Sequence, residues 1–128
     1  MVAYSIMKFD RLSILKCKEL IETNKEGITL KLNGKKDIKN KGYYVSITNN
    51  TFNKVRFNDV YKLMLKAYLY EKNNSINAFI GGWFSAKSKK WYIDISLYFV
   101  NRQEALKVAK EYKQEAIFNI KNMQSIFL

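Results

Sequence analysis

The clearest alternation of apolar and polar positions in the chain runs from Ile76 to Phe99. In its second half every other residue is apolar, and the residues between them are polar or tyrosine (apolar Trp91, Ile93, Ile95, Leu97 and Phe99; alternate Tyr92, Asp94, Ser96 and Tyr98). A period of two residues predicts a β-strand with one apolar face. Residues 85–90 are polar and rich in lysine, which predicts a turn and an antiparallel hairpin with residues 76–84.

This hairpin has one register that matches both apolar faces. With Phe84 opposite Trp91, the apolar face also pairs Gly82 with Ile93 and Ile80 with Ile95. The second face then carries three cross-strand pairs: Trp83 beside Tyr92, Gly81 beside Asp94, and Phe79 beside Ser96. We therefore expect an aromatic surface that is interrupted at a glycine, with one carboxylate facing the gap.

Helical periodicity predicts three helices. Asp10 is a good N-cap for a helix that runs to about residue 23, and Asn58 or Asp59 is one for a helix that runs to about residue 73. The third begins at Asn101, where Glu104 completes a capping-box pattern.

Shorter patterns predict the remaining strands. They are ITLKL after Gly27, GYYVSIT from Gly42, a short partner at residues 54–57, and EAIFNI from Glu115, while Asn33-Gly34 is a turn signal. The order of elements predicts a single α+β domain over residues 1–128. It has a mainly antiparallel sheet of about five strands with three helices packed on it.

Composition places the chain among folded globular domains outside the membrane. It has 128 residues, of which 48% are hydrophobic and 15% aromatic, so one core can form. No apolar run is long enough to span a bilayer, and the first residues lack the pattern of a secretory signal. With Cys17 as the single cysteine, these features favour a cytoplasmic location.

The charge is strongly positive, with 23 basic and 11 acidic residues and a net charge of +12. This charge suits nucleic acid or another polyanion, and it excludes a protein that imitates DNA. A lysine-rich composition that reflects a low-GC genome would give the same net charge without any nucleic-acid partner. The richest segment runs from Lys31 to Arg56, and its candidate phosphate contacts are Lys35, Lys36, Lys39, Lys41, Lys54 and Arg56.

No catalytic pattern is found. The chain has no histidine, and we find no clustered zinc ligands, phosphate-binding glycine loop or nucleophile elbow. Cys17 lies on an apolar helical stripe, which favours a buried hydrophobic role. We therefore expect a protein that is not an enzyme, with no catalytic residue, cofactor or metal.

Four short motifs in fixed order resemble those of a family of small bacteriophage and prophage accessory proteins of unassigned function. A GYxVS strand at residues 42–46 is followed by GGW at 81–83, YxDxS at 92–96, and a tail over residues 104–118. The similarity extends over roughly Gly27 to Ile120. It implies a phage accessory protein acting in the cytoplasm of a host bacterial cell.

Three binding hypotheses follow. In the first, the protein docks on a host factor such as a defence enzyme and inhibits it through Phe79, Gly81, Trp83, Tyr92 and Asp94. In the second, the basic segment and the aromatic residues hold RNA or single-stranded DNA. In the third, Gly81 and Asp94 form a pocket for a nucleotide or an amine. A purely structural interpretation competes with all three: the glycines form a bulge or admit a helix, and Asp94 fixes a backbone amide.

Overall fold

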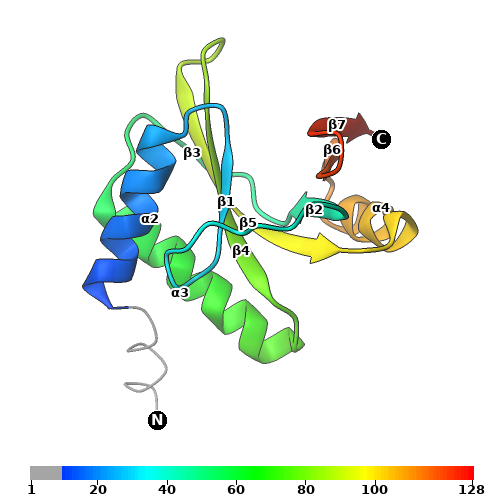
Figure 1. Cartoon of the computed structure of the whole chain (residues 1–128), viewed down its shortest axis with the longest axis horizontal. Coiled ribbons are helices and arrows are strands. Elements are labelled where there is room, and N and C mark those ends of the chain that lie inside the picture. Colours follow the sequence, from blue (N-terminus) through cyan, green and yellow to red (C-terminus); the bar gives the residue numbers. More distant parts are fainter. Residues whose placement is uncertain (1–9) are drawn as a thin grey trace.

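The computed structural model describes residues 10–128 (Figure 1). Its helices are α2 (Arg11–Thr23), α3 (Phe57–Asn74) and α4 (Arg102–Glu111). Its strands are β1 (Ile28–Leu30), β2 (Tyr43–Ser46), β3 (Thr51–Phe52), β4 (Ala78–Ser85), β5 (Lys90–Phe99), β6 (Ala116–Asn119) and β7 (Gln124–Phe127). The elements confirm the α+β class.

One antiparallel sheet contains all the strands, in the order β1-β4-β5-β2-β6-β7, with β3 paired to β5 next to β2. It has seven strands, two more than predicted. β4 and β5 form the central hairpin, and its register is the predicted one, with Phe84 opposite Trp91 and Gly81 opposite Asp94. The turn of this hairpin projects beyond the rest of the molecule at the top of Figure 1.

The helices of the described residues pack on one face of the sheet, which we call the helix face. α2 and α3 lie side by side over β1, β4 and β5, and α4 lies over β2 and β6 (Figure 1). The α2 stripe of Ile14, Cys17 and Ile21 is buried, which confirms the role predicted for Cys17. Two small residues on α4, Ala105 and Ala109, are fully buried and let that helix approach the sheet closely.

Two predicted helix caps are confirmed. The side chain of Asp10 accepts a hydrogen bond from the Ser13 N–H at 2.8 Å, and that of Asn101 accepts from Gln103 and Glu104. The cap predicted for α3 is wrong, because its N-cap is Arg56 and Asn58 lies inside the helix. The predicted strand at residues 54–57 is therefore also wrong, and β3 lies three residues earlier. The apolar spacing of Phe57, Val60 and Met64 continues the helical stripe into this segment.

The C-terminal strand β7 was not predicted. Its four residues are mostly exposed and too few to give a clear periodicity. The turn before it contains no glycine, and Met123 adopts the left-handed conformation there, with φ of 57°. Turn chemistry of this kind gives little signal in a sequence.

Candidate functional site

The face opposite the helices, which we call the open face, is covered by no helix of residues 10–128. It carries the side chains that alternate with the core residues of the sheet, with Trp83, Tyr92 and Asp94 near its centre. Trp83 keeps 46% of its surface accessible to solvent, which is unusual for a tryptophan inside a strand. The register therefore places the three side chains on one face as predicted, with Trp83 exposed and with Tyr92 and Asp94 partly buried.

Trp83 and Tyr92 form a stacked aromatic pair. Their ring centroids are 4.8 Å apart and the two planes differ by 13°. The stack lies two residues from the β4–β5 turn, where Lys87 and Lys89 are exposed. Neither lysine forms an ion pair within the described residues. The open face thus combines an exposed aromatic stack with unpaired positive charge.

Asp94 holds a β-bulge between β2 and β3. Ser46 lies opposite Ser96, and Thr51 lies opposite Tyr92. The chain advances five residues from Ser46 to Thr51 but only four along β5 from Ser96 to Tyr92, so the segment between β2 and β3 contains one extra residue. Asp94 Oδ1 accepts the Thr48 hydroxyl at 2.9 Å and the Asn50 N–H at 2.8 Å, and Thr48 Oγ1 accepts the Ile95 N–H at 3.0 Å.

The environment of Asp94 makes its ionisation less favourable. Burial raises the pKa of Asp94, and the hydrogen bonds from Asn50 and Thr48 oppose that effect. The structural interpretation of Asp94 is therefore correct for Oδ1, which fixes a backbone amide. The second oxygen, Oδ2, receives no hydrogen bond from residues 10–128.

Phe79 departs from the prediction. Only 5% of its surface is exposed, so it cannot serve as an accessible anchor on the open face. The β1–β2 connection covers it, and the Lys39 ammonium lies 4.6 Å from the centroids of both the Phe79 and Tyr98 rings. Lys39 also pairs with the buried Asp37 at 3.1 Å, and the Tyr44 hydroxyl donates to the same carboxylate.

The cluster of Asp37, Lys39 and Tyr44 that covers Phe79 changes the properties of Tyr44 and the role expected for Lys39. Burial and the bond to Asp37 raise the pKa of Tyr44. The ammonium of Lys39 is committed to Asp37 and two rings, so its predicted role in binding phosphate is not supported. The cluster closes the part of the open face next to β2, and it leaves the Trp83–Tyr92 stack uncovered.

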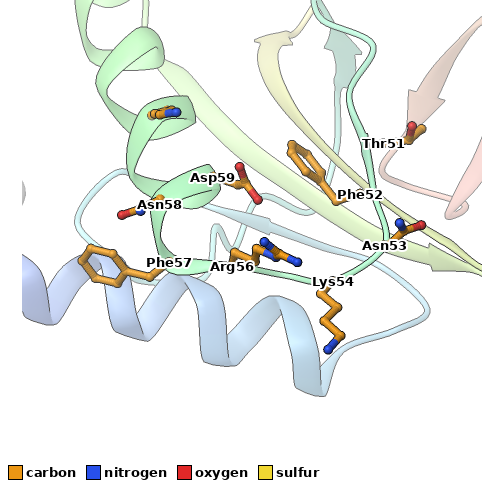
Figure 2. Close-up of a pocket in the computed structure, with 9 residues that line it drawn as sticks. Thr51, Phe52, Asn53, Lys54, Arg56, Phe57, Asn58 and Asp59 are labelled. Atoms are coloured by element: carbon orange, nitrogen blue, oxygen red, sulfur yellow. The ribbon is translucent and has the colours of Figure 1, made fainter.

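The other predicted basic residues separate into two places. Lys35, Lys36 and Lys41 are exposed along the β1–β2 connection, where Lys36 forms an isolated bridge with Leu30. Lys54 and Arg56 line a hollow of about 620 Å³ between β3 and the start of α3 (Figure 2). The hollow is bounded by Thr51, Phe52, Asn53, Lys54, Arg56, Phe57, Asn58, Asp59 and Lys62.

The hollow adjoins the aromatic stack through β3. Thr51 lines the hollow and also lies opposite Tyr92 in the sheet. Lys54, Arg56 and Lys62 form no ion pair within the described residues, and Asp59 is the one carboxylate in the lining. The hollow therefore combines three cations without ion pairs and adjoins the strand position opposite Tyr92.

Sequence reasoning missed Lys62 and the residues of the bulge. The position of Lys62 in the sequence indicates no partner, and only the placement of β3 beside the start of α3 brings it into the same hollow as Arg56. Thr48 and Asn50 carry no local signal, because the carboxylate that they bind is more than forty residues away in the chain.

Two kinds of feature are absent from the described residues. Within residues 10–128, no three side chains of the metal-binding types converge to hold an ion. None of the helices described has the length and apolar character needed to cross a bilayer.

Comparison with known proteins gives no match, since no family model, curated protein or solved structure is significantly similar to the chain.

Proposed function

We propose that the protein binds single-stranded nucleic acid on the open face of its sheet and catalyses no reaction. The observation that carries the proposal is the exposed Trp83, stacked on Tyr92 beside unpaired lysines. Every base has a π-face that can stack on an aromatic ring, and lysines neutralise the phosphates between bases. A sheet face with no helix over it leaves room for the strand to lie flat.

The charge distribution supports a path for the strand. Lys87 and Lys89 lie at one end of the stack, and the hollow with Lys54 and Arg56 lies beyond Tyr92. A strand that crosses the stack therefore meets positive charge on both sides. The net charge of +12 adds a long-range attraction that weakens with salt.

Fluorescence anisotropy with labelled mixed-sequence single-stranded oligonucleotides, over a salt series, tests this proposal. Trp83→Ala should weaken binding at least about fivefold, because stacking contributes about 1–3 kcal/mol per base. Phe127→Ala is the matched control, since that side chain is 77% exposed on β7 at the opposite end of the sheet. Absence of binding at low salt, or equal losses in both variants, would refute the proposal.

A second candidate is inhibition of a host factor by a phage-encoded accessory protein. Trp83 is the feature that favours it, because an exposed tryptophan amid smaller side chains is a typical anchor of a protein interface. A pull-down from a bacterial lysate, with and without nuclease, separates the two candidates. A captured protein that survives nuclease treatment and is lost with Trp83→Ala would favour the host factor over nucleic acid.

A further inference from the structure

The hollow between β3 and the start of α3 has walls that are anchored in the core. Val55 and Val60 are buried, with 5% and 0% of their surfaces exposed, and Phe52 packs against the same core cluster. Lys54 and Arg56 flank Val55 and are exposed, so the buried valine fixes the backbone from which both cations extend. A volume of about 620 Å³ is within the range of sites that hold small ligands.

Three cations from two elements converge on this hollow. Lys54 and Arg56 come from the connection between β3 and α3, and Lys62 comes from α3 itself (Figure 2). None of them forms an ion pair within the described residues, and Asp59 is the one carboxylate of the lining. Three cations and one carboxylate give the lining a net charge of +2. Like charges around one hollow repel one another, and a bound anion turns that repulsion into attraction.

Amide groups of the lining add hydrogen-bond donors. The Lys90 ammonium donates to Asn53 Oδ1, so the NH₂ group is the half of that amide left for a ligand. Asn58 lies four residues before Lys62 on α3, which places both side chains on one face of the helix. The lining therefore offers ammonium, guanidinium and amide donors to a group that is rich in acceptors.

The charge and the donors of the lining suit a phosphomonoester better than other common anions. At neutral pH a phosphomonoester carries a charge of about −1.5 to −2 and three strong acceptor oxygens. An internal phosphodiester of a strand carries a single negative charge, and a carboxylate has one charge and two oxygens. The planar guanidinium of Arg56 can also bind two phosphate oxygens at once.

We propose that the hollow binds a phosphomonoester, the group found at a phosphorylated end of a nucleic-acid strand and in a free mononucleotide. For a strand end, this inference rests on the proposed binding of single strands. Thr51 lines the hollow and lies opposite Tyr92, so a strand that stacks on Trp83 and Tyr92 ends beside the hollow. The site adds a preference for phosphorylated ends that stacking alone does not provide.

Fluorescence anisotropy with oligo(dT) of roughly ten nucleotides tests the strand end. Strands with a phosphate at the 5′ end, at the 3′ end or at neither end are compared, each labelled at an internal base. One phosphorylated strand should bind at least about fivefold more tightly than the unphosphorylated strand, the effect expected of one charge-assisted contact. Arg56→Gln should abolish this preference. The fold should tolerate the change, because the Arg56 side chain makes no capping hydrogen bond to α3.

Lys107→Gln is the matched control, because it removes one exposed positive charge from α4, which does not line the hollow. It should leave the ratio of the affinities unchanged. Thermal melting with an excess of thymidine 5′-monophosphate, compared with thymidine, tests the free nucleotide. A shift without an end preference identifies the free nucleotide as the ligand, and an end preference without a shift identifies the strand end.

The two proposals fail in different ways. If neither effect appears, or if the effect observed persists in Arg56→Gln, the phosphomonoester site is refuted and single-strand binding is left intact. Single-strand binding is judged by the unphosphorylated strand alone, and its failure to bind at low salt refutes that proposal whatever the phosphorylated strands do.

Discussion

The ring of Tyr98 lies directly against the backbone of Gly42. A Cβ at residue 42 would come within 2.5 Å of the ring atom Cε1, and the φ of Gly42 is +103°. The Tyr98 hydroxyl donates to the Lys41 carbonyl at 2.8 Å, so the ring cannot easily move away. The glycine that begins the GYYVS segment is thus required for both space and conformation.

Gly42→Ala should lower the free energy of unfolding by about 1–3 kcal/mol, because it adds a left-handed strain to a steric clash. Urea denaturation measures the change. Gly81→Ala is the control, since its backbone is not left-handed and the added Cβ would meet only the Ser96 Oγ, at 3.2 Å, and the Asp94 carbonyl oxygen, at 4.0 Å, so its loss of stability should be smaller. An unchanged midpoint for Gly42→Ala would mean that the Tyr98 contact is not maintained in solution.

The thiol of Cys17 should be unreactive in the folded protein. It is 0% exposed in the α2 stripe, and burial raises the pKa of Cys17 to about 11. A thiol-specific chromogenic reagent at about pH 8 should label it only as fast as the fold opens. Protein unfolded in urea gives the reference rate, and native labelling at that rate would contradict the buried position.

The pH dependence of stability should report on Asp94. Burial raises the pKa of Asp94 above its unfolded value of 3.8, so the folded state holds the proton more tightly. The resulting stabilisation is present below the unfolded pKa and is lost as the pH rises through the folded pKa. Asp94→Asn cannot titrate. Its melting temperature relative to the native protein should therefore be higher at about pH 7 than at about pH 3.

Thermal melts of both proteins across this range provide the measurement. Asp94→Ala is the informative comparison, because it loses the acceptor for Thr48 and Asn50 and should be less stable at every pH. If the melting temperature of Asp94→Asn relative to that of the native protein instead rises as the pH falls, the predicted effect of Asp94 on stability is wrong.

The hairpin lysines should contribute to the salt dependence of binding. Replacing both Lys87 and Lys89 with glutamine should lower the slope of log K against log salt by about 1–1.5, as expected for two phosphate contacts on a single strand. The same change at Lys107 and Lys110 on α4 is the matched control, since both are exposed on the helix side of the sheet. Equal effects of the two pairs would indicate that only the total charge matters.

The β4–β5 hairpin could be predicted in full because its information is local. Alternating positions determine which side chains share a face, and two apolar faces match in one register only. The helix caps at Asp10 and Asn101 are local too, and both were predicted correctly.

The rest of the site depends on contacts between distant segments. Gly82 is required for the close approach of α2, because an added Cβ would lie 2.9 Å from Cγ2 of Ile21, and nothing near Gly82 in the sequence reveals that position. The burial of Phe79 likewise depends on Lys39, about forty residues earlier in the chain. Periodicity assigned these residues to the correct faces, but it could not tell which parts of a face are covered.

The sheet topology has a consequence for how the protein is made. β1 pairs with β4, and both β2 and β3 pair with β5, so none of the first three strands pairs with another of the three. During synthesis the leading half of the polypeptide therefore has no complementary strand until the central ribbon leaves the ribosome. Folding of the nascent chain must be late and must join remote segments, a situation that slows folding and prolongs exposure of apolar strands.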